Sequence, residues 1–246
     1  MNDSFSLLLK SRPQCARGHA LIDCEHCKIR LVSICAAFEP EDIDVLQSMA
    51  QPVCFAAKQT LFLENDDSDC AYTITEGLLR LYRIFADGRR HVIGFLLPGD
   101  FIDAEADGHH GFSADAITEV GMCSFPKAQF AKVVKQRPHV LQRLYESSAK
   151  ELIDAREHML MLGQRSAEEK LAWFLIHMRS RLARIGVDSQ TVDLPMSRLD
   201  IADYLGLTIE TVSRTLSAFG RNRSIAIFPH GIELLDHRRI ERLAAT

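Results

Sequence analysis

The hydrophobic pattern of this chain changes its period once, at Pro138, and that change limits the folds it can adopt. From about residue 52 to 126, short strands alternate with turn signals such as Asp87-Gly88 and Pro98-Gly99-Asp100. After Pro138, apolar residues recur every three or four positions, as on a helix. We therefore predict an α+β fold with an N-terminal antiparallel β-roll and a helical C-terminal half. The strand candidates are Thr60–Leu63, Ala71–Ile74, Leu78–Phe85 and His91–Leu97.

A heptad seam runs along the first predicted helix, over residues 138–163. Steps of four and three residues alternate along it, as in helices that pair with a partner. We predict a dimerisation helix; packing on its own domain is the alternative. Ser166 and Glu169 then have the spacing of a capping box that starts the next helix. The predicted dimer interface is Leu141, Tyr145, Ser148, Leu152, Ala155, Met159 and Leu162.

Residues 196–219 have the spacing of a helix-turn-helix. Ser197 with Asp200 can cap a first helix, Gly206 permits the tight turn, and Thr208 can cap the second helix. The residues expected to face a core are Leu199, Ile201, Ala202 and Leu205 on the first helix, and Val212, Leu216 and Phe219 on the second.

The opposite side of the second helix would face the major groove of DNA. There Arg214 could bond guanine O6 and N7, and Glu210 could accept from cytosine N4. A solvated Glu–Arg pair is the alternative interpretation. Residues 225–234 predict a β-hairpin wing, and the two arginines before it could reach phosphates. The predicted DNA-binding residues are Ile209, Glu210, Ser213, Arg214, Arg221 and Arg223.

Charge is spread unevenly along the chain. The net charge of −4 argues against a generally basic nucleic-acid binder. Residues 165–246, however, carry 12 Lys and Arg against 10 Asp and Glu, and 11 of those 12 cations are Arg, which suits phosphate and guanine contacts. No run of 18 apolar residues and no signal-peptide pattern occur, so we expect a soluble, cytoplasmic protein without a membrane partner.

Four of the seven cysteines, at positions 15, 24, 27 and 35, lie within 21 residues. This clustering indicates metal or redox chemistry, because disulfide frameworks are rare in the cytoplasm. Thiolates at the Cys24-x-x-Cys27 spacing can bind the irons of a cluster or a single zinc ion. A thiol-redox enzyme would need a βαβ context that is missing around this motif, so we expect no enzyme.

The order of β-roll, long helix and winged helix-turn-helix resembles the CRP–FNR family of transcription regulators. Gly94-Phe95-Leu96-Leu97-Pro98-Gly99-Asp100-Phe101 looks like the family's roll motif, and residues 203–214 are similar to the recognition segment of its FNR and FixK branch. The resemblance covers nearly the whole chain. One departure is Arg223-Ser224, where many relatives have Gly, so the turn there is expected to differ.

The resemblance implies a homodimer that binds double-stranded DNA at TTGAT-type inverted repeats, with RNA polymerase as a further partner. It also implies that the chain is divided into four parts. These are a cysteine-rich cluster-binding segment (1–37), a cyclic-nucleotide-binding-like β-roll sensory domain (38–137), a dimerisation helix (138–163) and a winged helix-turn-helix domain (164–246).

The same resemblance implies an oxygen-responsive regulator with one [4Fe–4S] cluster per subunit. Its ligands would be Cys24, Cys27 and Cys35, with Cys123 of the roll as the fourth; Cys15 is interpreted as a bystander. A zinc-stabilised or thiol-redox regulator that does not sense oxygen directly stays open, as does a haem or nitric oxide sensor of the same fold.

Cyclic nucleotide is not expected as a ligand. The family members that bind it use an Arg beside a Ser or Thr in a loop comparable to residues 108–114, and here Phe112 stands in the place of that Arg. The two histidines of the loop, His109 and His110, are mostly neutral at pH 7 and cannot replace the cation.

Overall fold

The computed structural model describes residues 23–103, 108–187, 191–229 and 231–245. The chain divides into two compact units, Met1–Arg83 with Phe95–Glu146, and Ile84–Gly94 with Ser147–Thr246. Within the described residues, no helix is both long enough and apolar enough to cross a membrane.

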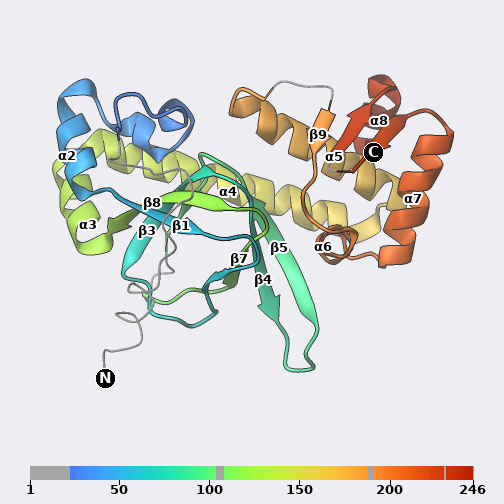
Figure 1. Ribbon diagram of the computed structural model, residues 1–246, viewed down its shortest axis with the longest axis horizontal. Helices are drawn as coiled ribbons and strands as arrows, with labels where there is room; N and C mark the ends of the chain where they lie inside the picture. The colour runs from blue at the N-terminus through green and yellow to red at the C-terminus, as the bar shows by residue number, and fades with distance from the viewer. Residues whose placement is uncertain (1–22, 104–107, 188–190, 230, 246) are drawn as a thin grey trace. The chain divides into compact units, whose positions relative to one another are not determined.

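Two four-stranded sheets form the β-roll, in the strand orders β1-β8-β3-β6 and β2-β7-β4-β5 (Figure 1). The side chains of Ile74 and Val120 in the first sheet and of Leu79 and Ala114 in the second are fully buried, as expected where each strand turns one face inward. The antiparallel roll predicted from the short strands and the turn signals between them is thereby confirmed. The strands are β1 Gln51–Phe55, β2 Thr60–Phe62, β3 Cys70–Glu76, β4 Leu79–Ile84, β5 Arg90–Leu96, β6 Phe101–Ile102, β7 Ser113–Ala116 and β8 Val120–Pro126.

Short helices flank the roll. Arg137 donates from Nε to Asp42 Oδ1 over 2.6 Å and so ties the end of α3 to the helix pair η3 and α2. These helices enclose a small apolar core that contains Phe38, Leu46, Phe125 and Phe130. The helices are η1 Arg30–Val32, η2 Ile34–Ala37, η3 Pro40–Asp42, α2 Ile43–Met49 and α3 Lys127–Gln136.

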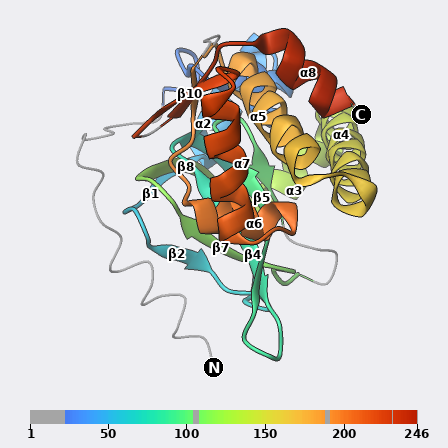
Figure 2. The same ribbon diagram turned by 90° about the vertical axis from the view of Figure 1, so that its right-hand side faces the viewer.

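The second unit is built around α5, whose Phe174, Leu175 and Met178 are almost fully buried. The predicted capping box starts this helix: the backbone N–H of Ser166 donates to Glu169 Oε2 over 2.7 Å, and that of Glu169 donates to Ser166 Oγ over 3.3 Å. Figure 2 shows α7 at the front of the view, beside α5 of the same unit. The elements are α4 Pro138–Gln164, α5 Ala167–Arg184, β9 Thr191–Asp193, α6 Arg198–Leu205, α7 Ile209–Arg221, β10 Ile225–Phe228, β11 Gly231–Leu234 and α8 His237–Ala245.

Candidate nucleic-acid interface and thiol cluster

Local interactions define the helix-turn-helix formed by α6 and α7. Ser197 and Asp200 form a capping box at the start of α6. Gly206 ends that helix with φ +61°, a left-handed conformation that costs Gly little. Thr208 Oγ1 then accepts from the backbone N–H of Thr211 over 3.2 Å and caps α7. The motif predicted over residues 196–219 is therefore present.

The buried sides of α6 and α7 agree with the prediction except at one position. Val212, Leu216 and Phe219 are buried as expected. Leu199 is 48% exposed, so its expected core role is wrong. The buried side of α6 centres on Ile201, Ala202, Tyr204 and Leu205, and Leu199 lies about 200° from Ile201 around the helix.

The outer side of α7 carries the residues predicted to read DNA. Ile209, Glu210 and Arg214 are exposed, and Ser213 is half-buried. Hydrogen bonds to the carboxylate of Glu210, from its own backbone N–H and from Thr208, hold its pKa below the ordinary value. Glu210 is therefore an ionised acceptor at neutral pH, the state needed to accept from a cytosine amino group.

The wing follows α7 directly. Strands β10 and β11 pair antiparallel with Ile225 opposite Leu234, and β9 extends the sheet. Arg221 and Arg223 are exposed at the start of this wing. Arg223 has φ +54°, in the left-handed region that Gly adopts without strain. The turn thus keeps a glycine-like conformation although an arginine occupies it.

A buried lysine that the sequence analysis missed joins two helix ends. Lys170 is 8% exposed, and its Nζ donates to Leu162 O of α4 over 3.1 Å and to Leu205 O of α6 over 3.4 Å. A cation near two helix C-termini is stabilised by their carbonyl groups and helix dipoles. Apart from its place in α5, nothing in the sequence pattern marked this residue.

The four cysteines predicted as ligands lie close together in the first unit. Cys24 and Cys35 are buried beside Phe38 and Phe125, and Cys123 of β8 packs against the same core. Burial, followed by the charges of the nearby thiolates of Cys35, Cys27 and Cys24, raises the pKa of Cys123 to about 12. The structure thus brings these four residues together, whereas Cys15 lies outside the described residues.

A hollow of about 290 Å³ adjoins this cluster. Cys27 and Cys123 line it, together with Lys28, Glu76 and Met122. The turn at Gly99 meets η1: a Cβ on Gly99 would lie 3.2 Å from Val32 Cγ2. The segment that carries the thiols is therefore held against the roll, with one side open to solvent.

Two buried donors border Cys35. Arg30 Nε and Thr73 Oγ1 have no hydrogen-bond partner within the part of the chain that the structure describes. Burial raises the pKa of Cys35 to about 11, while a hydrogen bond from Ser33 and the nearby Thr73 hydroxyl and Arg30 guanidinium act in the opposite direction. Unpaired buried donors of this kind suit an anionic sulfur centre.

The thiols do not converge on a single point. Over residues 23–103, 108–187, 191–229 and 231–245, no three His, Cys, Asp or Glu side chains are arranged to hold one metal ion. A polynuclear cluster is compatible with wider spacing, because each iron takes its own thiolate. Four cysteine thiolates are the ligand set that [4Fe–4S] clusters use.

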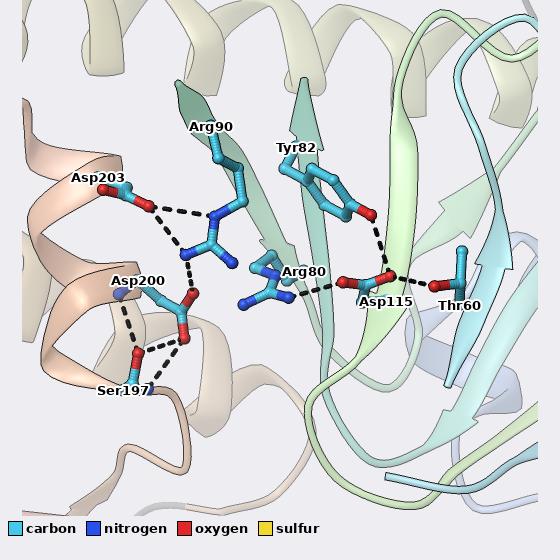
Figure 3. Close-up of polar contacts among 8 residues, drawn as sticks. All are labelled: Thr60, Arg80, Tyr82, Arg90, Asp115, Ser197, Asp200 and Asp203. Carbon is cyan, nitrogen blue, oxygen red and sulfur yellow. Dashed lines mark hydrogen bonds and ion pairs between the residues drawn. The ribbon is translucent and has the colours of Figure 1, made fainter. Parts of the chain in front are cut away.

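The loop of residues 108–114, which corresponds to the nucleotide-binding loop of some family members, is packed with aromatic rings. The rings of Phe62 and His110 stack with centroids 3.5 Å apart, and Phe112 lies 6.0 Å from Phe62. Burial lowers the pKa of His110 to about 4, so this ring is neutral at pH 7. The nearby sheet holds Arg80, whose Nη2 donates to Asp115 Oδ2 over 2.6 Å (Figure 3).

Most of the residues predicted for the dimer seam are exposed along α4. Leu141, Tyr145, Leu152 and Met159 are between 50% and 75% exposed, and Leu162 is half-buried. Ser148 and Ala155 are exposed between them. A second exposed pair that the sequence analysis did not include, Ile153 (53%) and Leu160 (74%), widens this apolar strip.

Comparison with known proteins gives matches over most of the chain. Two family models match, the cyclic nucleotide-binding domain over residues 52–137 and the Crp-like helix-turn-helix domain over residues 169–243. The chain is 47% identical over 222 residues to the nitrogen fixation regulation protein FixK of Bradyrhizobium diazoefficiens, which covers 90% of this chain and 94% of the relative. It is 45% identical over 223 residues to the transcriptional activatory protein AadR of Rhodopseudomonas palustris, covering 90% and 93%. The solved structure of FixK2 from Bradyrhizobium japonicum has a TM-score of 0.75 and 33% identity, over 80% of this chain and 98% of that one.

Proposed function

Since this chain belongs to the CRP–FNR family of DNA-binding transcription regulators, we propose that it is an oxygen-responsive transcription activator. In this proposal, a homodimer binds inverted repeats of the TTGAT type in the cytoplasm and contacts RNA polymerase. The relatives are named as regulators and not as enzymes, which supports a role without catalysis.

The exposed side of α7 supports direct reading of DNA bases. Arg214 has a guanidinium that can meet guanine bidentately, and the ionised Glu210 can accept from cytosine. Arg221 and Arg223 stand where cations would meet the phosphate backbone at the wing. Two such helices in a symmetric dimer would lie one DNA turn apart, which requires an inverted repeat.

The proposal of oxygen sensing rests on one observation. Cys24, Cys27 and Cys35 lie close to Cys123, beside two buried donors without a hydrogen-bond partner among the described residues. We propose that these four thiolates hold one [4Fe–4S] cluster per subunit. When bound, such a cluster supplies a centre that oxygen can degrade. The stacked rings of Phe62 and His110 support a roll that takes no cyclic nucleotide.

The packing of the thiol segment suggests how its state could reach the dimer helix. Cys24, Cys35 and Phe38 share a core with Val140, which is fully buried in the first turn of α4, and with the partly buried Leu144. Leu141 and Tyr145, on the outer side of the same turns, belong to the proposed seam. Ordering of residues 24–38 would therefore stabilise the start of α4, and their release would loosen the helix that pairs the subunits.

An anaerobic preparation tests this function. Iron, sulfide and zinc would be measured along with the visible spectrum, and binding to an inverted-repeat duplex would be compared before and after exposure to air. We expect about four irons and four sulfides per chain, an absorption that bleaches in air, and weaker DNA binding afterwards. A colourless zinc protein whose DNA binding is the same in air would instead support the zinc-stabilised alternative.

A further inference from the structure

We propose that Arg30 is a positioning residue for the cluster, donating a hydrogen bond from Nε to a sulfur of the loaded centre and balancing its negative charge. This inference rests on the proposed iron–sulfur function and concerns a residue that is not itself a ligand.

Arg30 is fixed by one end of its guanidinium. Its Nη2 donates to the backbone carbonyl of Phe38 over 2.8 Å, which bridges the start and the end of the loop that carries Cys35. Its Nε is buried and has no hydrogen-bond partner among the described residues. A buried donor without an acceptor is unfavourable and is uncommon in folded proteins, so this atom indicates an acceptor that joins the site later.

The backbone of the loop places that acceptor among the thiols. The backbone N–H of Arg30 donates to Cys27 O over 3.1 Å, and the backbone N–H of Phe38, whose carbonyl holds Nη2, donates to Cys35 O over 3.1 Å. The guanidinium of Arg30 therefore lies in the loop between two of the proposed ligands. An N–H aimed at a thiolate or a bridging sulfide would form a charge-assisted hydrogen bond.

Charge balance supplies a second reason. Four thiolates around a [4Fe–4S] core of charge 2+ leave a net charge of 2−, which is costly to bury without a cation. Lys28 also lines the hollow, but its side chain is exposed and its charge is screened by solvent. His26 is exposed and already paired with Asp23 over 2.8 Å. Of these three basic residues of the described segment, Arg30 is thus the one placed to act on the centre from within the protein.

The test compares Arg30→Gln and Arg30→Lys with Lys28→Gln, which removes a neighbouring charge from the exposed side. Each protein would be loaded anaerobically, and iron loss to a chelator and the midpoint potential of the cluster would be measured. Removing a hydrogen-bond partner of a metal site typically weakens the site tenfold or more, so we expect roughly tenfold faster iron loss for Arg30→Gln. We also expect a more negative midpoint potential for Arg30→Gln. Reduction adds an electron to the cluster, and the loss of the Arg30 positive charge makes this less favourable. Lys28→Gln should resemble the wild type, and Arg30→Lys should lie between Arg30→Gln and the wild type.

The melting temperatures of the unloaded proteins separate a cluster effect from misfolding. A potential in Arg30→Gln equal to that of Lys28→Gln would overturn the proposal, even if iron loss were faster, because only a group near the cluster shifts its potential. A wild-type protein that holds no iron and sulfide would overturn both the proposed function and this inference. A loaded wild type with an unaffected Arg30→Gln would overturn this inference alone.

Discussion

The Nη2 atom of Arg90 lies 2.8 Å from Asp200 Oδ1 and joins the β4–β5 hairpin to the first helix of the helix-turn-helix (Figure 3). Asp203, one turn further along α6, accepts from the same Nη2 over 2.9 Å and from Nε over 3.2 Å. Asp200 also caps α6 through Ser197 and is almost fully buried. One guanidinium therefore pairs with two carboxylates of α6, all within the second unit.

Replacing Arg90 with Ala should destabilise the second unit by about 3 kcal/mol, because it leaves a buried carboxylate without its cation. Urea unfolding would measure the loss, and hydrogen exchange should show faster opening of the hairpin and of α6. The neighbouring Arg89 is a matched control: it is highly exposed and pairs locally with Asp87, so Arg89→Ala should cost about 0.5 kcal/mol or less. Equal losses of stability in Arg90→Ala and Arg89→Ala would contradict the importance of the ion pairs between Arg90 and α6.

Replacing Cys35 or Cys123 with Ser should remove most of the bound iron and sulfide, because each loss leaves one iron of the cluster without a thiolate. Metal and sulfide analysis after anaerobic purification would show this. Cys70 provides the control: it is a half-buried free thiol that is not part of the core around Cys24 and Cys35. Retention of full iron content in Cys123→Ser would remove that residue from the ligand set.

Arg214→Ala should weaken binding to an inverted-repeat duplex by about 1–3 kcal/mol per half-site contact and relax the preference for one base pair. Glu210→Gln should mainly alter the preference at a different position, since a carboxylate acceptor is replaced by an amide. Lys132→Ala removes an exposed cation from α3 and should leave affinity unchanged. Competition assays with single-base variants of the duplex would measure these effects. An Arg214→Ala protein with unaltered specificity would assign that residue to phosphate contact or to solvent.

Leu152→Glu and Leu160→Glu should shift the loaded protein towards monomer, because each places a charge on the exposed apolar strip of α4. Sedimentation without oxygen would give the dimer fraction. Lys150→Glu adds negative charge about 160° from Leu152 but only about 80° from Leu160 around the same helix, so it is the control for Leu152→Glu and should have little effect if Leu152 lies in the seam. If only Leu160→Glu dissociates the dimer, the seam runs through Ile153 and Leu160 and the predicted heptad is shifted by one residue.

The second unit should lose stability as the pH falls from about 6.5 towards 4. His177 stacks on Trp173 with ring centroids 4.7 Å apart, and burial, followed by the charge of Arg181, lowers its pKa to about 4. The unfolded chain binds a proton near pH 6.5, whereas the folded chain resists it until about pH 4, so acid favours unfolding. Asp154 opposes this shift, while His158 and Lys150 add to it.

Measured by urea unfolding, the contribution of His177 should be on the order of 2 kcal/mol between pH 8 and pH 5. His177→Phe keeps an aromatic ring against Trp173 but cannot be protonated, so its stability should fall less over the same range. An identical pH dependence in both proteins would show that other groups control the acid response.

Features that depend on neighbouring residues could be predicted from the sequence. The capping boxes at Ser166 and Ser197 and the left-handed turn at Gly206 form within a few residues, so their spacing is sufficient evidence. The roll and the helix-turn-helix were predicted for the same reason, since each strand or helix shows its own period. The error at Leu199 arose because Asp200 turns inward to pair with Arg90, which shifts the buried side of a short helix.

Features that join distant segments could not be predicted in this way. Arg90 and Asp200 are 110 residues apart, and Lys170 meets the carbonyl of Leu205 35 residues later. No period or local spacing encodes such contacts. Arg30 illustrates the same limit, because its importance depends on an unpaired Nε that becomes visible only when the loop from Cys27 to Phe38 is folded.

The contact of Lys170 with the last carbonyls of α4 and α6 has a consequence for the DNA site itself. It links the end of the proposed pairing helix to the end of the first helix of the DNA-reading motif through one buried side chain. In a dimer that pairs through α4, the protein would then fix the distance between the α7 helices of the two subunits. An operator with one extra base pair in its spacer would present its second half-site rotated by about 35° and displaced by about 3.4 Å. The length of a stretch of DNA that no side chain touches would thereby become part of what this regulator recognises.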